Sequence, residues 1–255
     1  MTTPQTQKEN VNNTYFDGFY QEVWRAIIPA GLTEREVEFM LPYFALKPGD
    51  KVLDIMCGYG RHAIELARKG IEVTAIDNLT SYIKEVNATA KKENLPITTI
   101  RADVATHNLD DEFNLALCMG NSLNFFNAGD SLQLLKNICD HLIPGGNILI
   151  NTWSLAEIAI KHFTAHSSHS FAGIEFVNKA RYLFHPTRVE TDSTIIFNDG
   201  RKEEKKAIDY IFSVNEFERL LDAAGFKLKM IYSIPGKKQF SLGDPRAYIV
   251  AVLAR

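Results

Sequence analysis

The sequence predicts an α/β fold in which a mostly parallel sheet is covered by helices on both faces. Five short apolar runs alternate with helical patterns. These runs are the strand candidates "KVLDIM", "IEVTAID", "ITTIRAD", "FNLALCM" and "NILINTW". The segments between most of them, such as "RHAIELARKG" and "LQLLKNICDHL", have helical apolar spacing and end at Gly or Pro-Gly. Near-continuous apolar strands separated by helices are typical of parallel sheets that are buried on both faces.

The composition limits the classes of protein that fit. With 255 residues and 45% hydrophobic content, the chain can bury a large core, which favours one domain with a modest insertion. The net charge is -3 and the 28 Lys and Arg residues are dispersed, so a nucleic-acid partner is disfavoured. No apolar run reaches the length of a membrane span, and the first 13 residues do not resemble a signal peptide. The three cysteines are odd in number, which predicts reduced thiols in a cytoplasmic protein.

A helix is expected before the first strand. The segment "TEREVEFMLPYF" carries a Thr33…Glu36 pattern that predicts a capping box at its start. Pro42 is expected to end or kink this helix, because proline removes a backbone donor.

The pattern changes after Trp153. Strand-like segments lie between Phe171 and Phe212, with the hairpin turn "NDG" at residues 198–200 between the last two. A second capping box, Ser213…Glu216, then begins a helix. Two last strands, "KLKMIYSI" and "RAYIVAVLA", follow it. The antiparallel segments therefore form an insertion in an otherwise regular α/β chain.

The turn after the first predicted strand carries a glycine motif. Gly58-Tyr59-Gly60 lies where a buried strand passes into a helix, and glycine there lets the backbone approach a ligand closely. With Ala63 these glycines also fit the dinucleotide fingerprint, and Asp77, 19 residues after Gly58, is placed to bind a ribose. By itself the motif leaves open a simple tight turn, NAD, or another nucleoside ligand.

Three observations favour a ligand other than NAD. Asp54 lies inside the end of the first strand, where a dinucleotide fingerprint normally has an apolar residue, and its carboxylate suits an ammonium group. Asp103 in "RADV" ends the third strand and is in position to meet an adenine amino group. The turn at 144–146 and the closing "GDPRAYIVAVLAR" suggest a seven-stranded sheet whose last strand is reversed.

In combination these motifs resemble the class I S-adenosylmethionine-dependent methyltransferases of the small-molecule type. The resemblance runs from roughly Thr33 to residue 255, without the 171–212 insertion. It implies a Rossmann-like three-layer sandwich, S-adenosyl-L-methionine as cofactor and S-adenosyl-L-homocysteine as product. In that family the first strand acid and glycine loop hold the methionine part, the second strand acid takes the ribose, and the third meets the adenine. The cofactor-binding residues implied are Tyr15, Tyr20, Asp54, Met56, Cys57, Gly58, Gly60, Arg61, His62, Asp77, Asn78, Asp103, Val104, Met119, Gly120 and Asn121.

Two departures from the family pattern stand out. Methyltransferases of this class usually have glycine two residues after the strand acid, whereas this chain has Met56. Those that modify nucleic-acid bases or protein amides often carry an Asn-Pro-Pro-Tyr type motif after the fourth strand. Here residues 120–123 are Gly-Asn-Ser-Leu, which points to a small-molecule acceptor, as does an antiparallel flap after the fifth strand.

The N-terminal segment places Tyr15, Phe16, Tyr20 and Trp24 at helical spacing. One interpretation is a hydrophobic face packed on a sheet. The other is a lid whose aromatic faces lie near the sulfonium, where a cation–π contact is worth about 0.5–2 kcal/mol. Different residues of one face can serve both purposes.

No decisive catalytic base is evident. The cysteines are too far apart in sequence for a metal site, so no metal is expected. His62 is expected to be structural; four further histidines lie in or beside the insertion, where solvent-facing roles are the default and a base is the alternative: His162, His166, His169 and His185. Tyr20 and Asn121 are the catalytic candidates near the pocket, with no proton transfer assigned to either.

The sequence predicts three parts of the chain. Residues 1–32 form the N-terminal segment and lid helix, 33–153 with 213–255 bind S-adenosylmethionine, and 154–212 form the antiparallel substrate flap. The expected function is in-line methyl transfer to a nitrogen, oxygen or carbon atom of a small molecule, by an enzyme that needs no membrane. The alternatives are a non-catalytic S-adenosylmethionine-binding regulator, an RNA methyltransferase and an NAD-dependent oxidoreductase. A homodimer is compatible with the sequence, which does not specify the oligomeric state.

Overall fold

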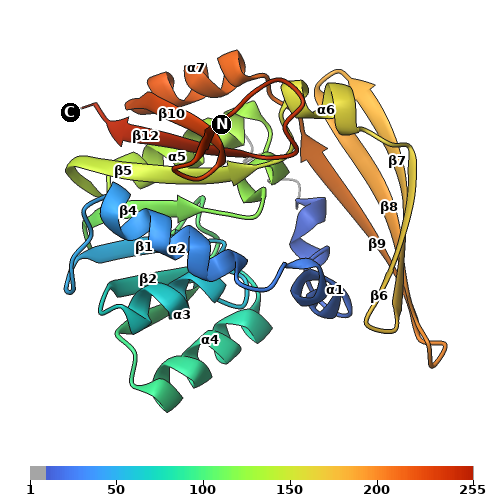
Figure 1. Ribbon diagram of the computed structural model, residues 1–255, viewed down its shortest axis with the longest axis horizontal. Coiled ribbons are helices and arrows are strands. Elements are labelled where there is room, and N and C mark those ends of the chain that lie inside the picture. Colours follow the sequence, from blue (N-terminus) through green and yellow to red (C-terminus); the bar gives the residue numbers. More distant parts are fainter. Residues whose placement is uncertain (1–9, 255) are drawn as a thin grey trace, which may run out of the picture. The chain divides into compact units, whose positions relative to one another are not determined.

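The computed structural model describes residues 10–254 (Figure 1). By the density of its internal contacts the chain divides into two units. The larger unit comprises Pro29–Phe163 and the described residues from Asp209 onward, and the smaller one comprises Thr164–Ile208 and the described residues up to Ile28.

The larger unit is built on one mixed sheet. Within the described residues, its strands are ordered β11-β10-β12-β5-β4-β1-β2-β3. They are β1 (Lys51–Ile55), β2 (Glu72–Asp77), β3 (Ile97–Arg101), β4 (Phe113–Cys118), β5 (Leu142–Thr152), β10 (Phe226–Ile234), β11 (Lys238–Gln239) and β12 (Ala247–Leu253). Strands β1 to β5 pair in parallel, whereas β12 runs antiparallel to both β5 and β10. The predicted mostly parallel sheet with a reversed last strand is therefore confirmed, and the two-residue β11 extends it by one strand at the edge.

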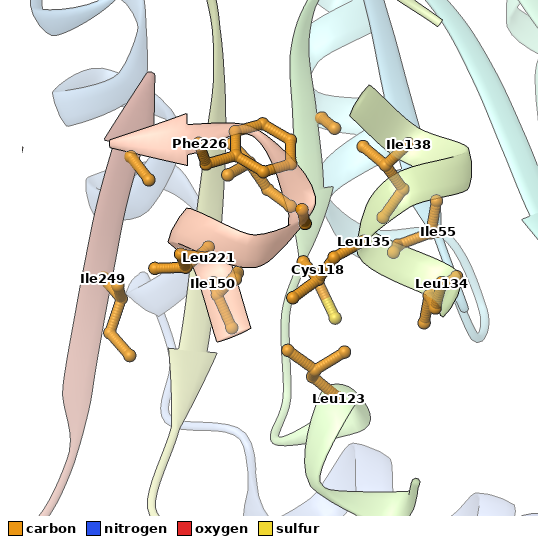
Figure 2. Close-up of a cluster of buried hydrophobic side chains, with 14 of the residues drawn as sticks. Ile55, Cys118, Leu123, Leu134, Leu135, Ile138, Ile150, Leu221, Phe226 and Ile249 are labelled. Atoms are coloured by element: carbon orange, nitrogen blue, oxygen red, sulfur yellow. The ribbon is translucent and has the colours of Figure 1, made fainter. Parts of the chain in front are cut away.

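Helices cover both faces of this sheet, as Figure 1 shows. They are α2 (Leu32–Tyr43), α3 (Arg61–Arg68), α4 (Thr80–Glu93), η2 (Ser122–Phe125), α5 (Ala128–Cys139), α6 (Ala156–His162) and α7 (Val214–Ala224). On one face, side chains of α5 and α7 pack against alternate residues of the central strands, including Ile55, Ile150 and Ile249 (Figure 2). On the other face, α2, α3 and α4 bury a second cluster that includes Val37, Leu66 and Val86. None of the described helices combines the length and the apolar character that a membrane crossing requires.

The two predicted capping boxes have different outcomes. The one at Ser213 and Glu216 is formed in both directions and begins α7, so that prediction is confirmed. The one at Thr33 is wrong, because α2 begins at Leu32 after Gly31 and has no side-chain cap. Thr33 lies inside the helix, and the Glu36 carboxylate bonds elsewhere. The helix does end just after Pro42, as expected from the missing backbone donor.

The smaller unit contains an antiparallel sheet with the order β6-β7-β8-β9. Its elements are η1 (Val11–Thr14), α1 (Tyr20–Ile27), β6 (His166–Phe171), β7 (Ile174–Phe184), β8 (Thr187–Phe197) and β9 (Lys202–Tyr210), whose last two residues belong to the larger unit. The hairpin turn predicted at 198–200 joins β8 to β9. The helical spacing predicted for the aromatic segment is interrupted, because Gly18 adopts φ +58° between η1 and α1.

Candidate functional site

The turn from β1 to α3 forms a glycine-shaped loop, here called the cradle, at residues 54–61. Gly58 and Gly60 both adopt the left-handed conformation, with φ of +57° and +76°. A Cβ atom on Gly60 would lie 2.6 Å from Cγ2 of Val86, so close packing requires glycine there. A Cβ on Gly58 would meet nothing within 4 Å, so this backbone faces open space. Gly60 therefore serves packing, whereas Gly58 leaves room for a ligand.

Met56 holds the position where the family pattern has glycine. Its φ of +52° is in the left-handed region that glycine favours, at a cost of roughly 1–2 kcal/mol for another residue. Its half-buried side chain packs against the core cluster around Leu53 and Ile55, which offsets part of that cost. Met56 thus adopts the left-handed conformation that a glycine at this position would favour.

Asp54 places a buried carboxyl group beneath the cradle. The residue is 2% exposed, and its Oδ2 has no hydrogen-bond partner among the described residues. Burial raises the pKa of Asp54 to about 7, although the charge of Arg61 and the backbone N–H of Ala63 act in the opposite direction. A buried acid with an unused oxygen is costly to the fold unless a ligand pairs with it.

Asp77 ends β2 beside the same loop. Its Oδ2 accepts a hydrogen bond from the Gly58 N–H at 2.9 Å, and its Oδ1 accepts one from the Leu79 N–H at 2.8 Å. Burial raises the pKa of this carboxyl group, while these backbone donors lower it. Each oxygen retains a lone pair for another donor. The following candidate, Asn78, is exposed.

A buried polar network, which was not predicted from the sequence, lies next to the cradle and includes its last residue, Arg61. Glu36 of α2 accepts hydrogen bonds from Arg61 at 2.5 Å, from His62 Nε2 at 2.9 Å and from the Tyr248 hydroxyl at 2.6 Å. Burial would raise the pKa of Glu36, but the hydrogen bond from His62 and the nearby charge of Arg61 outweigh it and lower the pKa to about 2. The signal for this network is an acid on the apolar face of the predicted helix, beside Val37.

His62 is a structural part of that network. Burial, together with the charge of Arg61, lowers the pKa of His62 to about 4. The imidazole is therefore neutral at neutral pH and donates one ring N–H to Glu36. The network ties α2, the first turn of α3 and β12 together, which fixes the orientation of Arg61 beside Asp54.

The loop that follows β4 is organised around Asn121. This residue is 1% exposed and adopts φ +69°. Its amide nitrogen donates to Ser154 Oγ at 2.9 Å and to Asp209 Oδ1 at 2.8 Å. Its amide oxygen accepts from the Thr152 hydroxyl and from the backbone N–H groups of Trp153 and Ser154. Both amide hydrogens of Asn121 are thus used inside the protein, which suits a positioning role.

The neighbouring candidates of this loop have different environments. Met119 is 6% exposed and packs in the cluster beneath α2 and α3. Gly120 adopts φ +71° and donates its N–H to Asn151 Oδ1 at 3.3 Å. Asp209 was not identified from the sequence, because it lies 88 residues beyond Asn121 in the chain.

The candidates near the end of β3 lie on a turn. Asp103 is exposed, two residues beyond the last residue of β3, and its Oδ1 accepts the Ala105 N–H at 2.9 Å. The Val104 side chain is buried in the core, and its carbonyl accepts a hydrogen bond from Asn137. The exposed side chain of Asp103 is thus accessible to a ligand.

Tyr15 and Tyr20 belong to the smaller unit. Their rings lie 4.4 Å apart, and both side chains are buried in a cluster with Phe176 of β7 and Ile195 of β8. The Tyr15 hydroxyl also lies 3.1 Å from Ser193 Oγ. Within this unit both residues serve as a hydrophobic face packed on the antiparallel sheet.

The remaining histidines and the cysteines offer no metal site. Among residues 10–254, no group of three or more His, Cys, Asp or Glu side chains is placed to hold a metal ion. His166, His169 and His185 are exposed, and His162 Nε2 lies 2.9 Å from the Gly243 carbonyl. Cys57, Cys118 and Cys139 form no disulfide bonds.

Comparison with known proteins identifies relatives of this fold. Residues 52–146 match a family described as "Methyltransferase domain". The ubiquinone biosynthesis O-methyltransferase of Rickettsia akari is 30% identical over 102 residues, which are 40% of this chain and 39% of that protein. The CcbJ methyltransferase of Streptomyces caelestis has a TM-score of 0.81 at 14% identity, covering 97% of this chain and 100% of its own. An amino pentose methyltransferase of Micromonospora echinaspora, solved with S-adenosylmethionine bound, has a TM-score of 0.72 at 17% identity, with 93% and 97% covered.

These matches bear on the fold and on the family. The chain spans about two fifths of the length of the first curated relatives, and at such low identity the likeness to the solved structures concerns the fold. The matched residues 52–146 include β1, the cradle, β2 and the loop after β4. The predicted resemblance to class I S-adenosylmethionine-dependent methyltransferases is confirmed.

Proposed function

We propose that this protein, whose residues 52–146 match the methyltransferase domain family, transfers a methyl group from S-adenosylmethionine to a small-molecule acceptor. S-adenosylhomocysteine is the other product. The observation that carries the proposal is the pairing of an open Gly58 backbone with a buried Asp54 whose Oδ2 has no partner among the described residues. A loop of this kind suits a ligand that carries both a compact polar end and an ammonium group.

The residues of the cradle fit the methionine end of the cofactor. Asp54 would bind its ammonium group, which would also stabilise the ionised carboxylate in its buried position. The backbone of Gly58 would lie against the ligand, since nothing within 4 Å would oppose a side chain there. Arg61, His62, Met56 and Cys57 would act by shaping the loop.

The residues that follow β2 and β3 fit the nucleoside end. Asp77 would accept the ribose hydroxyls with its remaining lone pairs, and Asn78 would lie beside it. The exposed Asp103 and the backbone of Val104 would meet the adenine. Met119, Gly120 and Asn121 would line the junction between cofactor and acceptor.

When bound, the cofactor supplies a methyl group that is already electrophilic, so the protein contributes mainly alignment and exclusion of water. Asn121 would hold the loop after β4 in place rather than exchange protons, because its amide is fully used. Tyr20 stays a candidate for acceptor contact. We retain the predicted division in which 1–32 is a lid, 33–153 with 213–255 bind the cofactor, and 154–212 bind the acceptor.

Calorimetric titration with S-adenosylmethionine, S-adenosylhomocysteine and NAD tests the cofactor. We expect micromolar binding of the first two and none of NAD. Asp77→Ala should weaken binding by about 1.5–3 kcal/mol, or roughly ten- to a hundredfold, because it removes a charged acceptor. Asp110→Ala, which removes an exposed acid, is the matched control and should bind normally. Failure of the wild-type protein to bind either compound would reject the proposal.

Transfer of labelled methyl to a metabolite extract separates an enzyme from a regulator. Incorporation into small molecules supports the proposal, whereas binding without transfer favours the regulator. Incorporation into added RNA would instead favour the RNA methyltransferase. A cytoplasmic location and a homodimer stay predictions from the sequence.

A further inference from the structure

One acidic group near the loop after β4 has no role in the proposed cofactor site. Asp209, near the end of β9, is half-buried, and its Oδ1 accepts the only hydrogen bond that its side chain makes among the described residues. The donor is the amide of Asn121, at 2.8 Å. Since Asn121 follows the carboxyl end of β4, Asp209 lies near the sheet edge where β1 and β2 carry Asp54 and Asp77.

The backbone beside Asp209 is held firmly. The amide of Asn124 donates to the Tyr210 carbonyl at 2.8 Å and to the Ser154 carbonyl at 3.1 Å. The Thr152 hydroxyl lies 2.7 Å from Asn124 Oδ1 and 2.9 Å from Asn121 Oδ1. Two buried asparagines, braced by one threonine, therefore fix the position of the carboxyl group of Asp209.

This carboxyl group has no compensating charge. Among residues 10–254, no Lys, Arg or His forms an ion pair with Asp209, and no described residue donates to its Oδ2. Burial raises the pKa of Asp209 to about 7, although the hydrogen bond from Asn121 lowers it. A hydroxyl would give this carboxylate a hydrogen bond but no compensating charge, and a carbon atom would give it neither, whereas an ammonium group would supply both.

We propose that Asp209 is a specificity-determining residue that binds the reacting amino group of an amine acceptor, with Asn121 as its positioning residue. The amino group binds as an ammonium and gives one proton to the Asp209 carboxylate. Its freed nitrogen lone pair then forms the new N–C bond with the methyl group as the S–C bond of the cofactor breaks. This inference rests on the proposed methyl transfer and narrows the acceptor from any nitrogen, oxygen or carbon nucleophile to an amine. The fixed position of Asp209 at the edge that carries Asp54 and Asp77 supports it.

The experiment compares two defined probes. S-adenosylhomocysteine lacks the methyl group, whereas sinefungin carries an amino group at the position from which the methyl is transferred. If Asp209 binds an ammonium group near that position, Asp209→Asn should weaken sinefungin binding about tenfold or more, as for a lost charge-assisted hydrogen bond. The affinity for S-adenosylhomocysteine should change less than twofold. The exchange keeps the shape of the side chain, and the melting temperature checks the fold.

The controls separate this inference from the proposed function. Asp222→Asn changes the same charge at an exposed position of α7 and should leave both affinities unaltered. Equal effects of Asp209→Asn on the two probes, or no effect on either, would overturn the role of Asp209 while leaving the cofactor site intact. Absence of binding in the wild type would overturn the proposed function and this inference with it.

A second measurement addresses the acceptor itself. Acetylation of the amino groups in a metabolite extract should abolish transfer of labelled methyl by the wild-type protein. Transfer that survives acetylation would overturn the inference, because the acceptor would then be a hydroxyl or a carbon atom. Restoration of transfer after addition of untreated extract shows that the reagent has not damaged the protein.

Discussion

The cradle after β1 and the loop after β4 lie at the same edge of one sheet, but they use their polar groups in opposite ways. In the cradle, Gly58 faces open space and Asp54 Oδ2 has no partner among the described residues. In the loop after β4, both amide hydrogens of Asn121 are bonded within the protein, and its oxygen accepts three hydrogen bonds. The cradle thus keeps hydrogen-bonding groups available for a ligand, whereas the loop after β4 uses its hydrogen-bonding groups to hold its own conformation.

The two loops also differ in how far apart in the sequence their residues lie. A cradle for a common cofactor is built from neighbours in sequence, because strand, turn and helix follow one another within residues 51–68. The second loop joins three distant segments, which contain Asn121, Ser154 and Asp209. Rigidity there holds a single acid, Asp209, in a defined place for the acceptor.

The largest effect is expected for Asn121→Ala. The change leaves the Trp153 N–H and Asp209 without their partner and places alanine at φ +69°. It also removes one of the two partners of the Thr152 hydroxyl and of the Ser154 N–H. We expect the free energy of unfolding to fall by about 3–5 kcal/mol, as for the loss of a buried hydrogen-bond network. Urea unfolding measures it. Asn147→Ala, which loses one exposed 3.3 Å contact, is the control, and an equal effect of both would show that Asn121 is not the organising residue.

A smaller effect of opposite sign is expected for Asp54→Asn in the ligand-free protein. At pH 8 the buried carboxylate is ionised and its Oδ2 has no hydrogen-bond partner among the described residues, so the neutral amide should raise the free energy of unfolding by roughly 1–3 kcal/mol. Cofactor affinity should fall, because the ammonium group of the cofactor loses its partner. Greater stability with weaker binding is the pattern of a residue kept for function.

The pH dependence of this stabilisation has a defined sign. The pKa of Asp54 is about 7 in the folded protein against an ordinary value of 3.8, so between these values the folded state keeps a proton that the unfolded chain has released. The wild type therefore loses stability as the pH rises through this window. The gain from Asp54→Asn should grow from pH 4 to pH 7 and then level off. An equal gain at pH 4.5 and pH 8 would contradict it, and Asp110→Asn should show no gain at either.

The smallest effect is expected for Met56→Gly. Relief of the left-handed conformation, worth roughly 1–2 kcal/mol, is opposed by the greater backbone entropy of unfolded glycine and by lost packing. We expect the free energy of unfolding to change by less than about 1 kcal/mol. Met230→Gly, at a half-buried strand position without positive φ, should be clearly destabilising by the same measurement. Similar losses in both variants would mean that Met56 carries no conformational strain.

Much of the fold is predictable because its signals are local. The apolar runs of β1 to β5 and the alternating residues of the antiparallel sheet each reflect burial of a strand by its own side-chain spacing. The capping box at Ser213 is equally local, since the donor and the acceptor lie three residues apart. Asp54, Asp77 and the two glycines of the cradle are likewise close in sequence to the strands that position them.

The parts of the fold and of the site that could not be predicted depend on contacts between residues that are far apart in the sequence. Thr33 and Glu36 have the same spacing as Ser213 and Glu216, but Arg61, His62 and Tyr248 bind the Glu36 carboxylate instead. A residue 212 positions away in the chain gives no local signal. The hydrogen bond between Asp209 and Asn121 could not be predicted for the same reason. The residues proposed to bind the acceptor are therefore harder to predict from the sequence than those of the cradle.

The position of β12 has a consequence for biogenesis. This strand lies between β5 and β10 and pairs with both, although it is made after them. Until residues 247–253 have been synthesised, β5 and β10 each present an unpaired edge of backbone donors and acceptors. The sheet that carries the cradle is therefore completed only after β12 has been made, and a nascent chain that stalls before then exposes edges suited to misassembly or to capture by chaperones.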